Sequence, residues 1–171
     1  MARMVRMLIV PMLAFLLAGC ATAPSQPPGD VAIYMPREEM SGRDILAADL
    51  GTLPLQPEPV IAAAEIVSYS ASSHDLTLTP AAIARLAGFD VPVQGRGFVL
   101  CRGSRPLFAG AFWTSISSLS FDGLTINVPF ERHETSLHLY SGYPMRDDPL
   151  PNDPRDDPRL LEAFRQAGKL R

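Results

Sequence analysis

The central part of the chain, residues 60–143, consists of short apolar runs that are separated by turn-forming residues. Runs of about four to eight residues, bounded by glycine, proline, aspartate or serine, are typical of strands rather than of helices. They predict strands at residues 61–69, 75–79, 97–101, 106–113, 124–128 and 136–140. Because Arg102-Gly103-Ser104-Arg105 and Asp122-Gly123 are typical turn sequences, successive strands can pair as hairpins, and a mainly antiparallel sheet is expected.

One short packed helix is predicted within this region, from about Pro80 to Ala87. Thr79 is a suitable N-cap, Pro80 fits the first helical position, and Gly88 can end the helix in the left-handed conformation. A short helix on an antiparallel sheet gives the α+β class.

Most of the chain's 17 prolines flank this central part. The sequence ATAPSQPPGD at residues 21–30 predicts a flexible tether, and residues 31–59 are ambiguous, with one short helix around residues 44–50. Three Asp-Pro pairs within residues 144–158 predict an extended, solvated linker. Beyond it, a final helix is expected, with an apolar face made of Leu160, Leu161, Phe164, Ala167 and Leu170.

The first twenty residues have the order of a secretory signal. Arg3 and Arg6 precede an apolar stretch, residues 7–18, that is shorter than the roughly 20 residues a membrane-spanning helix needs. The last four of these twenty residues are more specific: Leu17-Ala18-Gly19-Cys20 resembles the lipobox of bacterial lipoproteins. An ordinary signal peptide, or a buried N-terminal helix with an incidental cysteine, is the alternative.

The lipobox resemblance implies lipid transfer to Cys20, cleavage between Gly19 and Cys20, and a protein held on a membrane of the cell envelope by fatty acyl chains such as palmitate. In such lipoproteins an aspartate after the cysteine often signals retention at the inner membrane, so Ala21 favours the outer membrane, with the domain in the periplasm. The chain is then expected to divide into a signal peptide (1–19), a lipidated tether with a short helical segment (20–59), an α+β domain (60–143), a linker (144–158) and a C-terminal amphipathic helix (159–171).

Few residues offer chemistry. Lys169 is the only lysine, near the end of the chain, which argues against Schiff-base or lysine-base mechanisms. Cys101 lies in an apolar, strand-like run and is expected to be a buried structural cysteine. The net charge of −3 and the lack of a basic stripe argue against a nucleic-acid partner.

The histidines are candidates for a metal site. His133, Glu134 and His138 have the spacing H-E-x-x-x-H, one residue longer than the zinc-protease helix motif allows. With His74 they could bind zinc only if the fold brings them together, and exposed histidines are the simpler interpretation. The acidic residues Asp147, Asp148, Asp153, Asp156 and Asp157 could attract calcium, but a solvated linker fits them better.

Two further sets of residues could bind a ligand. Arg96, Arg102 and Arg105 lie in residues 91–121, which contain no acid, and could bind phosphate or carboxylate groups or merely protect a hairpin end from pairing. Trp113 with Phe112, followed by the hydroxyl-rich sequence Thr114-Ser115-Ile116-Ser117-Ser118, could line a cleft for a sugar or another small ligand, or be a core aromatic.

No catalytic motif accompanies these residues: there is no G-x-S-x-G elbow, S-x-x-K pair, P-loop or dinucleotide fingerprint. The sequence therefore favours a membrane-anchored envelope lipoprotein whose domain is a binding or assembly module, with no cofactor besides the lipid on Cys20. One alternative is a small envelope hydrolase or metal-dependent enzyme that uses the histidines. The other is a structural subunit that docks on an envelope protein through the helix at residues 160–170.

Overall fold

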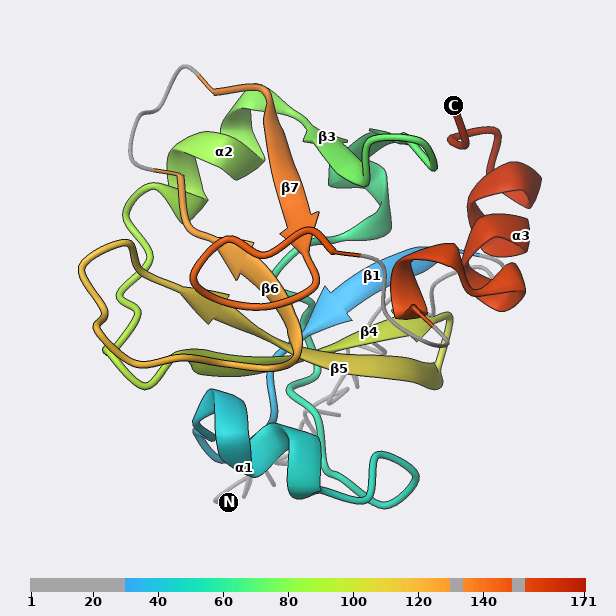
Figure 1. The fold of residues 1–171 in the computed structure, drawn as a ribbon. Coiled ribbons are helices and arrows are strands. Elements are labelled where there is room, and N and C mark those ends of the chain that lie inside the picture. Colours follow the sequence, from blue (N-terminus) through green and yellow to red (C-terminus); the bar gives the residue numbers. More distant parts are fainter. Residues whose placement is uncertain (1–29, 130–133, 149–152) are drawn as a thin grey trace, which may run out of the picture.

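The computed structural model describes residues 30–129, 134–148 and 153–171, and these form an α+β fold on one curved sheet (Figure 1). The strands are β1 (Val31–Tyr34), β2 (Ile66–Tyr69), β3 (Asp75–Leu78), β4 (Arg96–Arg102), β5 (Arg105–Trp113), β6 (Leu124–Asn127) and β7 (Ser136–Tyr140). The helices are α1 (Gly42–Ala47), α2 (Pro80–Leu86) and α3 (Pro158–Gln166), with 3-10 turns at Ala63–Glu65 and Pro154–Asp156. The predicted fold class is confirmed, although three helices rather than one pack on the domain.

The strand order is β1-β4-β5-β6-β7-β3-β2, and every pairing is antiparallel except that of β5 with β6. The β4–β5 hairpin crosses the middle of the molecule (Figure 1). Its turn is Gly103-Ser104, where Gly103 has a φ of 57°, a left-handed conformation that glycine adopts without steric cost. The predicted hairpin is therefore confirmed.

Both faces of this hairpin are covered, as its apolar composition requires. Phe98 and Leu100 face the main core, which α2 and α3 help to close, while Val99 and Cys101 face α1. Gly97 lies directly beneath α1: a Cβ there would lie 2.7 Å from Cβ of Ile45, so the glycine permits the close approach of the helix. The alternation of faces along one strand thus produces two separate apolar clusters.

Helix α2 has the predicted N-cap, but Gly88 does not adopt the left-handed conformation that was expected at the end of the helix. The hydroxyl of Thr79 accepts the N–H of Ala82, Pro80 opens the helix, and Ile83 and Leu86 are buried. Arg85 clamps this helix to the start of β2 through two hydrogen bonds to the Glu65 carboxylate, at 2.6 and 2.9 Å. These bonds hold the pKa of Glu65 below its ordinary value.

The sheet extends beyond the predicted domain limits at the N-terminal side. Strand β1 pairs with β4 from Val31↔Arg102 to Tyr34↔Val99, so residues 31–34 belong to the domain. Helix α1 starts before the expected 44–50, because Ser41 accepts the N–H of Asp44 and caps it there. The edge of β1 is protected by mutual backbone hydrogen bonds between Ile33 and Ile61.

The described part of the proline- and aspartate-rich segment corrects the prediction of a solvated linker. Arg155 is only 1% exposed; it binds Asp153 through both side-chain oxygens and also binds Asp147 and the Leu139 carbonyl. This buried arginine fixes the segment before α3 to β7. Residues 149–152 lie outside the described part of the chain.

Helix α3 packs on its own domain rather than away from it. Asp157 caps it as predicted, and Leu160, Ala163 and Phe164 are buried in the main core. The ring of Phe164 stacks on Tyr69 with centroids 4.8 Å apart. Beyond the helix, Lys169 and Arg171 hydrogen-bond the backbone of Tyr69 and cover the free edge of β2. None of the helices among the described residues is long and apolar enough to cross a bilayer.

Candidate functional site

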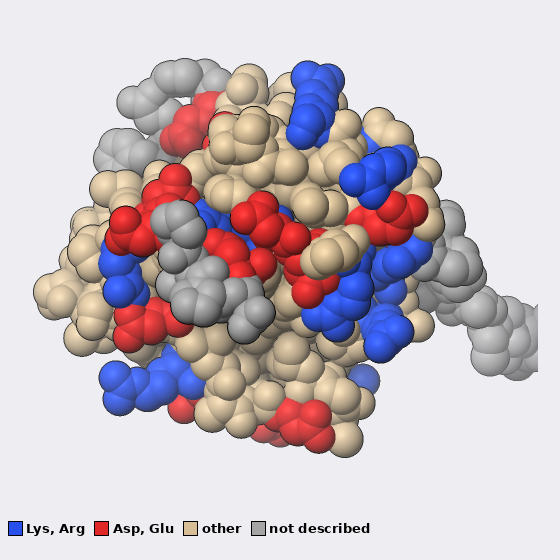
Figure 2. Space-filling model, turned by 45° about the vertical axis from the view of Figure 1, so that its right-hand side comes forward, with Lys and Arg blue, Asp and Glu red and all other residues tan. Residues whose placement is uncertain are grey.

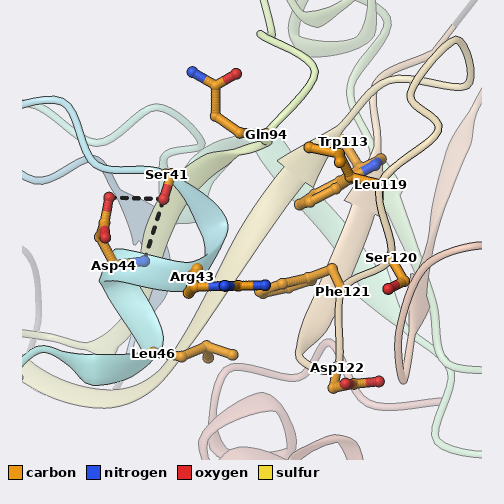
Figure 3. Close-up of a pocket in the computed structure, with 10 residues that line it drawn as sticks. All are labelled: Ser41, Arg43, Asp44, Leu46, Gln94, Trp113, Leu119, Ser120, Phe121 and Asp122. Atoms are coloured by element: carbon orange, nitrogen blue, oxygen red, sulfur yellow. Dashed lines mark hydrogen bonds between the residues drawn. The ribbon is translucent and has the colours of Figure 1, made fainter.

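A groove of about 620 Å³ lies where α1 faces the segment that leads into β6 (Figure 3). Arg43 and Leu46 of α1 lie on one side of it, and Leu119, Phe121 and Asp122 lie on the other. The remaining lining residues are Ser41, Asp44, Gln94, Trp113 and Ser120. Three segments that are distant in sequence form the groove.

Trp113 supports this groove from within the domain. Its ring stacks on Phe121 with centroids 5.1 Å apart and packs against Tyr143 at 5.4 Å. Gly42 and Gly95 make room for the indole, because a Cβ on either would lie within 3 Å of it. Only 2% of Trp113 is exposed, and its Nε1 has no hydrogen-bond partner among the described residues. Trp113 therefore does not present the exposed aromatic wall that a sugar cleft needs.

Exposed apolar side chains gather around the groove. Of the six large hydrophobic residues exposed in the described chain, five lie in the segments that form or border it: Leu46, Val93, Ile116, Leu119 and Met145. Three of these segments are tied together by hydrogen bonds: the hydroxyl of Ser117 donates to the Val93 carbonyl, and that of Tyr143 donates to the Ser117 carbonyl. Leu46 and Leu119 line the groove, and Val93, Ile116 and Met145 lie in the neighbouring segments; we call these five residues the groove patch.

Three charged residues line the groove, and Asp122 is the one that forms an ion pair within the described chain. Asp44 accepts a hydrogen bond from Ser41 at 2.7 Å, and Asp122 pairs with Arg146. Arg43 forms no ion pair within the described chain, so its guanidinium is available to a ligand. The site thus combines a half-exposed apolar lining with one cation, Arg43, and one anion, Asp44, neither of which has an ion-pair partner among the described residues.

The histidines do not meet in one site. His138 places Nδ1 at 2.9 Å from Asp75 and Nε2 at 3.2 Å from Asp147, so each ring nitrogen faces a carboxylate. Hydrogen bonds from Ser73 and His138 hold the pKa of Asp75 below its ordinary value, against the opposing effect of its partial burial. His74 instead contacts the Tyr69 hydroxyl at 3.2 Å.

Glu134 lines the same small cavity as His138, but His74 does not, and His133 lies outside the described residues. Within the described ranges, no group of three or more potential ligands could hold a metal ion. His74 and His138 therefore do not converge in one pocket. The geometry therefore gives no support to the enzyme alternative.

The predicted arginine set is divided by the fold. Arg96, at the start of β4, pairs with Glu39 at 3.1 Å and lies over the ring of Phe89. Arg102 and Arg105 lie at the other end of the hairpin, next to Arg159 of α3, which the sequence analysis did not single out. A second cavity, of about 320 Å³, opens between these three arginines.

The acidic set is likewise used for structure. Asp147 and Asp153 bind Arg155, and Asp157 caps α3 and pairs with Arg159. Asp156 belongs to the 3-10 turn, and Asp148 is exposed. Cys101 is buried as expected, and burial raises its thiol pKa to about 11. Gly19 and Cys20 lie outside the described residues.

Sequence reasoning missed most of the groove. Its residues come from α1, the link before β4 and the link after β5, which only the fold brings together. One signal was present: Ile116 and Leu119 are apolar residues in a serine-rich segment without strand periodicity, as expected for exposed hydrophobic side chains on a loop.

No protein-family model, no curated protein and no solved structure matches the chain. Its function therefore has to be argued from the groove, the arginine cavity and the N-terminal sequence rather than from relatives.

Proposed function

We propose that this protein is a lipid-anchored lipoprotein of the cell envelope whose domain binds a polypeptide partner through the groove patch. The observation that carries the binding function is the concentration of exposed apolar residues around one groove. Isolated exposed hydrophobic residues are ordinary, but an apolar patch rimmed by polar groups is typical of protein-interaction sites. A binding module is favoured over an enzyme because no catalytic constellation accompanies the groove among the residues that the structure describes.

The chemistry of the lining favours a polypeptide over a sugar. Sugars need an exposed aromatic face, whereas Trp113 and Phe121 are 2% and 5% exposed. The exposed groups are the aliphatic side chains of Leu46 and Leu119, together with the Arg43 guanidinium. These suit a segment with apolar side chains and a carboxylate that can approach Arg43.

The anchor follows from the resemblance of residues 17–20 to a lipobox. One fatty chain gives only marginal membrane attachment, at about 0.8 kcal/mol for each buried methylene, and two or three chains make it effectively permanent. Ala21 after the lipidated cysteine favours the outer membrane, with the domain in the periplasm. The partner is then another envelope protein.

Site-specific crosslinking in intact cells tests the binding function. Leu119 is 48% exposed at the groove, and Val67 is 46% exposed on β2, so the two positions form a matched pair. We expect p-benzoylphenylalanine at position 119, but not at position 67, to give a discrete polypeptide adduct after irradiation. Arg43→Gln in the same chain should weaken that adduct.

The masses of the adducts distinguish the possible occupants. A heterologous polypeptide at position 119 supports the proposal. An adduct of twice the protein's mass, a lipid adduct, or equal adducts at positions 67 and 119 would each contradict it.

The anchor is tested by counting thiols. Protein extracted from membranes should show no fast-reacting thiol while folded, because Cys101 is buried with a raised pKa. In guanidinium chloride with a disulfide reagent it should show one thiol per chain, and the Cys101→Ser variant should show none. Two thiols in the parent protein and one in the variant would mean that Cys20 carries no lipid.

A further inference from the structure

The turn of the β4–β5 hairpin and the start of α3 bring three arginines to one cavity. Arg102 and Arg105 lie opposite each other in the strand register, and Arg159 reaches them from the first turn of α3. Ser104 and Leu107 complete the lining of about 320 Å³, and no carboxylate residue is among the described residues that line it. We call these three residues the hairpin arginine cluster.

Two of the three guanidinium groups form no ion pair with a carboxylate of the described residues, although Arg102 lies near enough to Glu162 to help lower the pKa of that carboxylate. Arg159 binds Asp157 at 3.0 Å and lies 5.3 Å from the ring centroid of Phe108, which fixes its position. Arg102 donates instead to the side-chain amide oxygen of Gln166, at 2.6 Å, and exposed Arg105 forms no ion pair with any described residue. The cavity therefore carries excess positive charge that a phosphate could neutralise with bidentate hydrogen bonds.

The cluster lies where the chain enters the fold. The backbone N–H of Gly103, in the hairpin turn, donates to the Asp30 carbonyl at 2.7 Å, and Val31 is opposite Arg102. Cys20 precedes Asp30 by ten residues, which span at most about 36 Å when fully extended. A lipid anchor on Cys20 would thus keep the cluster close to the lipid headgroups, because the connecting segment is short.

Charged side chains are unevenly distributed over the surface. Figure 2 shows Lys and Arg side chains gathered on the right of this face and Asp and Glu side chains across its centre. After removal of Arg3 and Arg6 the chain keeps 13 basic residues against 18 acidic ones, so its net charge alone would not attract it to an anionic surface. Any attraction of the domain to an anionic surface therefore has to come from a local cluster of basic side chains.

We infer that the hairpin arginine cluster binds the phosphate groups of anionic phospholipids in the bilayer that carries the anchor. The inference rests on the proposed lipid anchor, which supplies the proximity. The cluster turns the hairpin end of the domain toward the headgroups.

Vesicle binding tests the inference. The protein is the mature chain, residues 20–171, which includes all the described residues. It carries Cys20→Ser so that no acyl chain contributes to binding. The probes are vesicles of phosphatidylglycerol with phosphatidylcholine and vesicles of phosphatidylcholine alone, at low salt. Arg102→Gln with Arg105→Gln is compared with Arg37→Gln and Arg171→Gln, an exposed pair with the same change in charge. Equal thermal midpoints of all three proteins serve as the control for folding.

We expect binding to the anionic vesicles only, weakened about 20- to 30-fold in the cluster variant and unchanged in the control variant. Equal weakening in both variants, or no binding to anionic vesicles, would overturn the inference. So would inorganic phosphate that binds the parent and not the cluster variant while vesicles fail to bind, since the ligand would then be a free phosphate. Because no acyl chain is present, none of these results depends on whether Cys20 is lipidated.

Discussion

Replacing Arg155 with methionine should lower the free energy of unfolding by about 3–5 kcal/mol. The side chain is 1% exposed, and the Asp153 carboxylate that it binds is 7% exposed. Removing the guanidinium leaves that carboxylate desolvated without its counter-charge and frees the Leu139 carbonyl as well. Urea denaturation of the mature chain, with the midpoint and slope both fitted, measures the loss.

The matched control is Arg165→Met. Like Arg155, Arg165 lies in the C-terminal part of the chain and pairs with a carboxylate, here that of Glu162. The side chain of Arg165, however, is 60% exposed. Exposed pairs of this kind contribute about 0–1 kcal/mol, so this variant should be nearly as stable as the parent. Similar losses from both arginines would mean that Arg155 is not a buried ion-pair residue.

Replacing Phe164 with alanine should cost about 3–5 kcal/mol of unfolding free energy. Phe164 is 1% exposed, it stacks on Tyr69, and the hydroxyl of Tyr69 donates to the Arg155 carbonyl at 3.0 Å. The truncation leaves a cavity between α3 and β2 and removes the stacked pair. Thermal unfolding followed by circular dichroism, together with urea titration, measures the change.

Phe164→Leu separates cavity formation from a general intolerance of change at this position. Leucine keeps most of the buried volume, so it should lose clearly less stability than alanine does. If both variants keep parental stability, α3 is not packed on the domain, and its apolar face would be free for a partner as the subunit alternative requires.

Local signals account for what the sequence predicted well. The N-cap of α2, the Gly103-Ser104 turn and the alternation of Leu137 and Leu139 in β7 each involve residues within one short segment. Such signals depend on backbone geometry and side-chain period, which neighbours in sequence determine.

Long-range pairing accounts for most of what was missed. The apolar run at β1 has four residues and lies beside proline-rich sequence, and its partner β4 lies more than sixty residues away. Arg155 is an arginine among aspartates, a composition that normally means solvation; its burial depends on β7 and α3 closing around it. The same applies to the groove, whose opposite sides come from α1 and from the segment before β6.

The nine residues of β5 run from Arg105 to Trp113, a rise of about 26 Å. A strand in the middle of a sheet cannot change its length without breaking the pairings on both sides. The two ends of this strand therefore act as fixed points on a rigid spacer. Lengthening or shortening the ten residues after Cys20 would change how far the domain can move from the membrane. The distance between a partner bound beside Trp113 and a phosphate bound at Arg105 would stay the same.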